Sequence, residues 1–460
     1  MAHNLFPQPR PKLRVGVLIL RRRRPGFDPQ WGAQIEAQAR EGLGRSALDV
    51  YLPGQQIVDA ATLRRAMEEC DSAGCGVYVA IQPTMSDGRM TPVLGRMSRA
   101  PVVFWATPEK PTGEMISANS LVGAHTFMAN LAQAGHRFDF VYGSPHDPGT
   151  IAELERAVYR AHACSVFDGV YAGLVGYHAP GFSDMHADPA TLATIGAELG
   201  HVGMHEFIDA VEAVPDEAAA ADVEEVRRLG LPISDEIPVD ELDNVLLLDS
   251  RYYLAIRTLM DEQPLQALAL RDWPEISATH WPYLALARLA SEGYPIAVEG
   301  DVDGALACLM AREAGCGVCY VSDWLEHGAH EITLWHTGAA PFQLCEPPGS
   351  SRAPQIGRHF NNRKPAVVNA TIRAGMPVTL FRFWHMQGEY LFTAIEGETI
   401  EPARHLLGTN GLARFDSVDV PEFFIAMVRA GMPHHPIIVE GHAKKHLSAV
   451  AEMLGMTRIE

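Results

Sequence analysis

Short apolar runs alternate with stretches of helical periodicity along the N-terminal part of the chain. The apolar runs predict strands at 15–20, 47–51, 76–80, 102–105 and 138–142, and the helical patterns lie at 29–43, 60–73 and 120–134. Such alternation is typical of a parallel sheet covered by helices. It therefore predicts a Rossmann-like or flavodoxin-like α/β domain over residues 1–146, without the G-x-G-x-x-G opening of a dinucleotide site.

The pattern changes twice further along the chain. The turn-rich segment Ser144–Gly149 marks a boundary, after which helical and apolar stretches alternate again as far as residue 315. Beyond it, short β-rich runs such as 366–372, 377–385 and 389–396 are separated by glycines and prolines. We expect a second Rossmann-like domain over 147–315 and a β-rich domain, built as an antiparallel barrel, over 316–460, with an active site where these two domains meet.

Composition narrows the classes of partner. With 460 residues the chain is too long for one ordinary core, and 47% hydrophobic residues is normal for a globular protein. A formal net charge of −19 argues against a nucleic-acid partner, and no run approaches the ~18 apolar residues of a membrane span. Seven cysteines, an odd number, and a polar, proline-rich start indicate a reducing, cytoplasmic location.

Two loops of the first domain carry candidate substrate contacts. Arg21–Arg24 follow the first predicted strand, and their simplest interpretation is a solvated loop. Because open α/β sheets bind ligands at the carboxyl ends of their strands, Arg23 is also a candidate clamp for an anion or a sugar hydroxyl. The polar loop Gln82–Asp87 follows the third strand and offers Gln82 for the same purpose.

Two carboxylates follow apolar runs in the second half of the chain. Glu299 comes after the run 294–298, and Asp323 comes after 317–321. Buried carboxylates are costly unless they are paired or bound to a cation, so a shared metal is the simplest explanation. Glu299, Asp301 and Asp303 could instead cap a helix that begins near Gly304, which suits Asp301 and Asp303 better than Glu299.

Histidines supply the remaining candidate ligands. His434 and His435 are adjacent, and in an extended chain neighbouring side chains point to opposite faces, so only one of them can enter a given site. The residues alone do not decide which one. His336 follows the apolar run 332–335 and is placed to face the same cavity, whereas His327 and His330 are expected in loops or on the surface.

These motifs together are similar to those of the L-fucose isomerase and L-arabinose isomerase superfamily, and the domain order matches that superfamily over nearly the whole chain. The resemblance rests on four segments: E-G-D-V-D-G-A at Glu299–Ala305, a carboxylate at Asp323, W-H-x-G-x-x-P at Trp335–Pro341, and H-H followed by G-H within His434–His442.

The resemblance implies a manganese ion, or another divalent metal, held by Glu299, Asp323 and His435. It implies that the two carboxylates catalyse the interconversion of an aldose and a ketose through an enediolate. His434 replaces an asparagine that meets substrate in the fucose enzymes, and His336 corresponds to an additional histidine of the arabinose enzymes; both are candidate substrate contacts.

The resemblance also implies a homo-oligomer, a trimer or hexamer, whose active sites draw on a neighbouring subunit's N-terminal domain. The cluster Arg21–Arg24 could then serve a neighbour's site. Three alternatives stay open at this point: an isomerase for a different, deoxy or anionic sugar, a non-catalytic sugar-binding protein, and a metallohydrolase.

Overall fold

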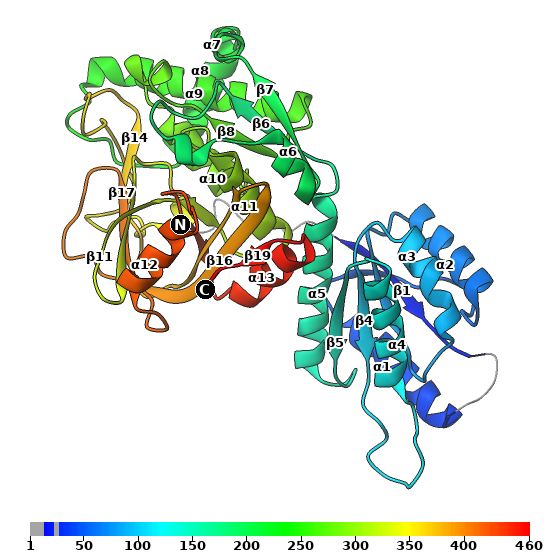
Figure 1. The fold of residues 1–460 in the computed structure, drawn as a ribbon. Helices are drawn as coiled ribbons and strands as arrows, with labels where there is room; N and C mark the ends of the chain where they lie inside the picture. The colour runs from blue at the N-terminus through cyan, green and yellow to red at the C-terminus, as the bar shows by residue number, and fades with distance from the viewer. Residues whose placement is uncertain (1–12, 23–26) are drawn as a thin grey trace. The chain divides into compact units, whose positions relative to one another are not determined.

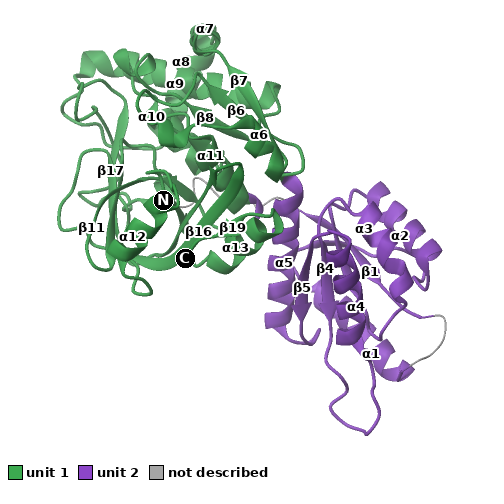
Figure 2. Ribbon diagram, in the orientation of Figure 1, with its two compact units in different colours: residues 1–9, 167–312, 316–460 green, residues 10–166, 313–315 purple. Residues whose placement is uncertain are grey.

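The computed structural model describes residues 13–22 and 27–460, which form two compact units (Figure 2). Unit 2 runs to Val166 and includes Glu313–Gly315, and unit 1 contains Phe167–Arg312 and Cys316–Glu460. The helix Pro148–Val166, which was expected to open the second domain, belongs to unit 2. Apart from Glu313–Gly315, the rest of the expected second and third domains lies in unit 1. The division into three domains stays a prediction.

Unit 2 is built on a five-stranded parallel sheet with the order β2-β1-β3-β4-β5 (Figure 1). Its strands are β1 Arg14–Ile19, β2 Asp49–Tyr51, β3 Val77–Ile81, β4 Val102–Ala106 and β5 Phe138–Tyr142. This is the flavodoxin-like order. The N-terminal parallel sheet predicted by the alternating pattern is confirmed.

Helices cover both faces of this sheet. Their bounds are α1 Pro29–Gly44, α2 Ala60–Ser72, α3 Thr91–Met97, α4 Ser120–Gln133 and α5 Pro148–Val166. Apolar side chains of α1 and α5 pack with one face of the strands, and those of α2, α3 and α4 pack with the other. The strands are buried on both sides, which explains their continuous apolar sequences.

Unit 1 begins with a four-stranded parallel sheet of order β7-β6-β8-β9. The strands are β6 Val170–Val175, β7 Ala197–Val202, β8 Ala267–Leu270 and β9 Ile296–Ala297. The helices of this part are α6 Pro189–Leu192, α7 Met204–Glu212, α8 Asp216–Arg228, α9 Val239–Glu262, α10 Tyr283–Ser291 and α11 Val302–Glu313. Helix α10 places side chains in the core of this sheet and in the core of the β-rich part, so the two parts share one packed interior.

The β-rich part is a ten-stranded, mainly antiparallel sheet, as its short β-rich runs predicted. Its main path is β10-β18-β15-β16-β17-β12-β11, with β13, β14 and β19 alongside. The strands are β10 Cys319–Val321, β11 Asp323–His327, β12 Glu331–His336, β13 Gln355–Gly357, β14 Val367–Thr371, β15 Pro377–Met386, β16 Glu389–Ile400, β17 Thr409–Arg414, β18 Ile437–Glu440 and β19 Thr457–Arg458. Helices α12 Val420–Arg429 and α13 Lys444–Met453 accompany them.

The expected closed barrel is not present among the described strands. Strands β10 and β11 form the two ends of the sheet path, and no backbone pairing joins them. They are consecutive in the chain, however, with only Ser322 between them. A bend at Ser322 therefore joins the two edges covalently, where a barrel would close them by hydrogen bonds.

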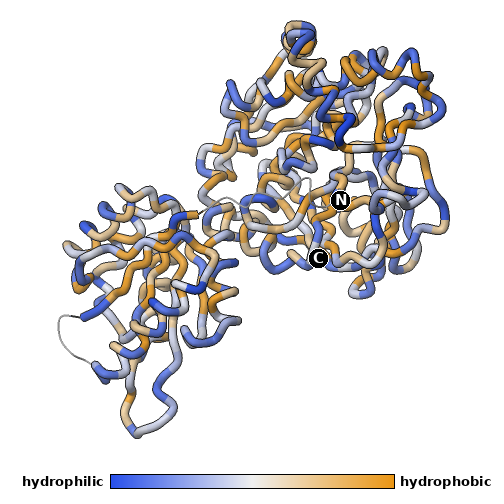
Figure 3. Tube along the Cα trace, turned by 180° about the vertical axis from the view of Figure 1, so that it is seen from behind, coloured by the Kyte–Doolittle hydropathy of each residue, from blue (hydrophilic) through white to orange (hydrophobic). Residues whose placement is uncertain are grey.

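The apolar segments of the chain run mainly along the interior elements of each unit, whereas many of the peripheral loops are hydrophilic (Figure 3). Among the residues that the structure describes, no helix is both long and apolar enough to cross a membrane.

Candidate active site

Glu299, Asp323 and His435 come together in unit 1. The Nε2 atom of His435 lies 3.4 Å from Oε2 of Glu299 and 3.5 Å from Oδ1 of Asp323. Glu299 follows β9 after one residue, Asp323 opens β11, and His435 precedes β18. The three residues that the sequence analysis grouped as a metal set are therefore neighbours in space.

Backbone hydrogen bonds bring Asp323 beside His435. The N–H of Ser322 donates to the carbonyl of Pro436 at 3.1 Å, and the N–H of Trp324 donates to the carbonyl of His434 at 3.3 Å. These bonds continue the pairing of β10 with β18 through the bend. The bend at Ser322 thus presents a carboxylate next to an imidazole.

Glu299 occupies an unusual backbone conformation. Its φ angle is 59°, in the left-handed region, which costs a residue other than glycine about 1–3 kcal/mol. Its N–H donates to Oδ1 of Asp272 at 2.8 Å, and its Oε1 accepts from Nε1 of Trp273 at 2.9 Å. Gly300 follows with a φ of 79°, and a Cβ there would lie 2.3 Å from the carbonyl oxygen of Tyr177. The turn therefore requires glycine at position 300.

Opposing effects set the charge of the two carboxyl groups at this turn. Burial acts to raise the pKa of Glu299, but contacts with the His434 and His435 imidazoles outweigh burial and lower that pKa. Burial, together with the charge of Glu299, raises the pKa of Asp272 to about 7. Glu299 is thus held as a carboxylate, and Asp272 titrates near neutral pH.

A buried ion pair orients His435. Its Nδ1 lies 3.1 Å from Oδ2 of Asp301, and Arg382 donates to both oxygens of that carboxylate at 2.7 and 2.8 Å. Asp301 also accepts from the N–H of Gly304 at 2.9 Å, so the expected capping role is present in addition. Burial opposes the ionised form of Asp301, but Arg382 and His435 lower its pKa. Burial acts to lower the pKa of His435, but contacts with the Asp301 and Glu299 carboxylates outweigh burial and raise that pKa to about 10.

The donor set fits a divalent cation. Ligand atoms of Glu299, His434 and His435 lie within 4.8 Å of one another, and so do those of Asp323, His336 and His435. The Nε2 atom of His435 is buried and forms no hydrogen bond with any described residue. Mixed carboxylate and imidazole ligands suit manganese, and an outer carboxylate on the second ring nitrogen is the usual support of a metal-binding histidine.

His434 faces the same space from a different environment. Its Nδ1 is 2.7 Å from Oδ2 of Asp184, its ring packs 4.6 Å from that of Phe182, and its side chain is 33% exposed. Its Nε2 is 3.8 Å from Glu299 and 3.9 Å from Asp323. Burial opposes protonation, but Asp184 and Glu299 raise the pKa of His434. His434 therefore places its imidazole close to the two carboxylates.

His336 is the last residue of β12 and lies inside the site. Its ring centroid is 5.2 Å from that of His435, and it is almost fully buried. The N–H of Thr337 donates to its Nδ1 at 2.9 Å, so the neutral ring carries its proton on Nε2. Burial lowers the pKa of His336 and favours this neutral form. His327 and His330 are exposed, as predicted.

A cavity of about 620 Å³ opens beside these groups. Aromatic side chains dominate its walls, and the described lining residues include no lysine or arginine. The aromatic members are Phe182, Trp273, Trp281, Tyr283, Trp324, Trp335 and Phe360. Aromatic walls with a few convergent polar groups, here carboxylates and histidines, are typical of a small-molecule site.

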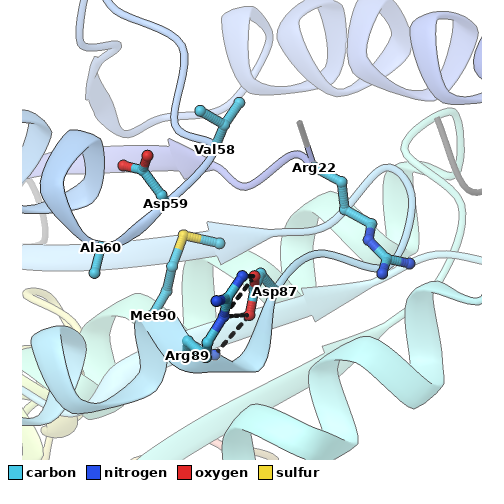
Figure 4. A pocket seen from close by; sticks show the side chains of 7 residues that line it. All are labelled: Arg22, Val58, Asp59, Ala60, Asp87, Arg89 and Met90. Atoms are coloured by element: carbon cyan, nitrogen blue, oxygen red, sulfur yellow. Dashed lines mark hydrogen bonds and ion pairs between the residues drawn. The ribbon is translucent and has the colours of Figure 1, made fainter. Parts of the chain in front are cut away.

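The remaining predicted contacts belong to unit 2. Arg23 lies outside the described residues. Its neighbour Arg22 lines a separate pocket, opposite the exposed pair of Asp87 and Arg89 (Figure 4). Gln82 is fully buried, and its Oε1 accepts from the backbone N–H and the hydroxyl of Ser86. The substrate roles of Arg23 and Gln82 stay predictions.

The sequence analysis missed three residues that support the site: Asp272, Asp184 and Arg382. Asp272 follows β8, whose four-residue apolar run was too short to be noticed as a strand. Arg382 lies in the middle of the apolar strand β15, and a charge there requires a partner, so it carried a usable signal. Asp184 lies in a polar loop, and its sequence context carried no such signal.

Comparisons with known proteins find relatives that cover most of the chain. Two sulfoquinovose isomerases, from Priestia aryabhattai and Priestia megaterium, are each 22% identical to the chain over 439 residues, covering 94% of this chain and 96% of theirs. A third sulfoquinovose isomerase, from Alkalicoccus urumqiensis, is 24% identical over 390 residues, covering 82% of this chain and 84% of its own.

Other comparisons add little. No protein-family model matches the chain. Among solved structures, a periplasmic solute-binding protein of an ABC transporter from Actinobacillus succinogenes, with bound D-allose, covers 62% of this chain and 83% of its own at 9% identity. Its TM-score of 0.18 is too low to bear on the fold or the function.

The relatives that match most of the chain identify it as a sugar isomerase. More particularly, the chain is an enzyme of the aldose–ketose isomerase class.

Proposed function

We propose that this enzyme interconverts an anionic aldose and the corresponding ketose, with a divalent metal, manganese by preference, held by Glu299, Asp323 and His435. The observation that carries the proposal is the convergence of two carboxylate oxygens on Nε2 of His435, at 3.4 and 3.5 Å, beside a cavity of sugar size. The relatives that cover most of the chain support the reaction class.

The reaction needs only proton transfers. A proton leaves C2 of the open-chain aldose, an enediolate forms, and a proton is returned to C1 while the hydroxyl proton moves from O2 to O1. Oε2 of Glu299 and an oxygen of Asp323 flank the reacting carbons and exchange these protons as base and acid. When bound, the metal supplies Lewis-acid stabilisation of the charge that develops on O1 and O2.

The histidines and the cavity walls orient the sugar. His336 donates from Nε2 to a substrate oxygen, since its Nδ1 is occupied by Thr337. His434, held by Asp184, offers a second donor beside the carboxylates. The aromatic walls restrict water around the enediolate, which strengthens every charged interaction in the site.

An anionic substrate is favoured by the relatives, whose name specifies sulfoquinovose, a sugar that carries a sulfonate. A neutral or deoxy aldose is the second candidate, because no lysine or arginine is found among the described residues of the cavity. The anionic end of the substrate would be met by N–H and O–H donors of the cavity. Alternatively, it would be met by basic residues such as Arg21–Arg24, supplied by a second copy of the chain in a trimer or hexamer.

A substrate panel tests the proposal. The metal-depleted protein is reloaded with Mn²⁺ and incubated with sulfoquinovose, L-fucose, L-arabinose and D-glucose, and ketose formation is followed. We expect the sulfonated sugar to give the highest kcat/KM. Higher kcat/KM for a neutral sugar would select the second candidate, and no ketose from any aldose would contradict the isomerase.

The variant Glu299→Gln tests the mechanism with a matched control. It keeps the size of the side chain and removes the base, so we expect a loss of kcat of at least ~10³-fold, within the range for an essential proton-transfer group. Glu326→Gln, on the exposed part of β11, keeps normal turnover. Normal turnover in Glu299→Gln would remove Glu299 from the mechanism.

A further inference from the structure

The polar atoms of Glu299 are nearly all held by fixed partners. Its N–H donates to Oδ1 of Asp272 at 2.8 Å, and its carbonyl accepts from the N–H of Ala179 at 2.8 Å. Its Oε1 accepts from Nε1 of Trp273 at 2.9 Å. Only Oε2 faces the histidines, at 3.4 Å from Nε2 of His435. The two oxygens of one carboxylate thus have different environments.

The partners of Glu299 come from one short segment. Asp272 and Trp273 directly follow the strand β8, after Arg271, and β9, which precedes Glu299, pairs with β8 in parallel. Asp272 is fully buried and receives a second hydrogen bond, from the hydroxyl of Tyr283 to Oδ2. Tyr283 is itself fully buried at the start of α10, so the position of Asp272 is fixed by the core.

This support is needed because the backbone of Glu299 is strained. A φ of 59° is sparsely populated by residues other than glycine, and such conformations persist only where the surroundings enforce them. Without an acceptor for its N–H, the residue would relax to negative φ. Its Cβ would then turn, and Oε2 would leave its place beside His435.

We propose that Asp272, fixed by Tyr283, is a positioning residue that locks the left-handed backbone of Glu299 and, together with Trp273, leaves Oε2 as the one working oxygen of the carboxylate. This inference rests on the proposed function of Glu299. It assigns to Asp272 no contact with substrate, since its two oxygens are occupied by Glu299 and Tyr283.

Three variants test the proposal through kcat and KM. Asp272→Ala removes the acceptor, and we expect kcat to fall by about 10²-fold, the cost of a small misplacement of a catalytic group, with KM changed less than about threefold. Asp272→Asn keeps an oxygen for the Glu299 N–H and restores kcat to within about tenfold of wild type. Tyr283→Phe, which removes the donor to Oδ2 and keeps the ring, gives a loss between these two.

A matched control separates positioning from general stability. Asp222→Asn disrupts another buried carboxylate of unit 1, paired with Arg288 at 2.7 Å, and lowers the melting temperature without changing kcat of the folded enzyme. If Asp272→Ala does not fold, the kcat values of Asp272→Asn and Tyr283→Phe test the positioning role instead. A kcat within threefold of wild type in Asp272→Ala, or in Tyr283→Phe where Asp272→Ala is unfolded, would overturn the proposal.

A crystal structure of the Asp272→Ala variant distinguishes failure of this proposal from failure of the proposed function, because it needs no turnover. We expect residue 299 at negative φ and its carboxylate displaced from His435. Retention of the left-handed φ with Oε2 in place would overturn the positioning role, even if the wild-type enzyme isomerises sugars. Relaxation of Glu299 supports it, even if no sugar tested is a substrate.

Discussion

Nδ1 of His435 lies 3.1 Å from Oδ2 of Asp301, and both side chains are completely buried. This contact turns Nε2 of His435 toward Glu299 and Asp323. Arg382 compensates the charge of Asp301 with two hydrogen bonds. A residue expected to cap a helix therefore also orients the central imidazole of the site.

Asp301→Asn is expected to weaken binding of Mn²⁺ by about 10–100-fold, the usual cost of losing the carboxylate behind a metal-binding histidine. The measurement is the dissociation constant for Mn²⁺ alone, by calorimetry on the metal-depleted protein. In the wild type, we expect Mn²⁺ at 100 times its dissociation constant to raise the unfolding free energy by about 2.7 kcal/mol. Equal affinities in variant and wild type would show that Asp301 does not support a ligand.

Arg382→Met is expected to lower the unfolding free energy by about 3–5 kcal/mol, because it leaves the Asp301 carboxylate buried without its compensating charge. Arg414→Met is the control: its partner Glu331 is 2.8 Å away, but the arginine side chain is 47% exposed. An exposed pair contributes about 0–1 kcal/mol. Urea unfolding measures the unfolding free energy of both variants. Similar losses in the two would contradict the distinction between the buried and the exposed ion pair.

His434→Asn places at this position the residue type expected in fucose enzymes. The change removes the imidazole whose pKa Asp184 and Glu299 raise against the effect of burial. We expect the ratio of kcat/KM for sulfoquinovose over L-fucose to fall by at least about tenfold, which corresponds to about 1.4 kcal/mol of lost discrimination. An unchanged ratio would show that His434 does not select the substrate.

His359 provides a test by pH. Burial, and then the neighbouring imidazole of His336, lower the pKa of His359 to about 4, against about 6.5 in an unfolded chain. The folded protein therefore favours the neutral ring, and its contribution to stability is complete above pH 6.5 and is lost as the pH falls from about 6.5 toward 4. In His359→Phe, which keeps the stacking on Trp281, we expect a smaller loss of unfolding free energy between pH 7 and 5. An identical loss would exclude His359 as its source.

Much of the fold could be predicted from local pattern. The apolar strands and amphipathic helices of unit 2 were visible because a parallel sheet covered on both faces needs continuous apolar runs. Strand β8 and helix α12 were missed. The four residues of β8 give too short a signal, and the pattern of α12 was obscured by the β-rich segments around it.

The prediction of a barrel was wrong for a different physical reason. Strand periodicity says which residues alternate between two faces, but it does not say which edges meet. Whether β10 and β11 pair with each other depends on the bend at Ser322, where the chain itself passes from one edge of the sheet to the other.

The sequence by itself determined the candidate groups: carboxylates at Glu299 and Asp323 and a histidine pair, each beside an apolar run that had to be buried. Tertiary structure decided how these groups are arranged. Which imidazole faces the carboxylates depends on Asp301 and Arg382, and which oxygen of Glu299 is free depends on Asp272 and Trp273. These contacts join residues far apart in the chain, so no local pattern records them.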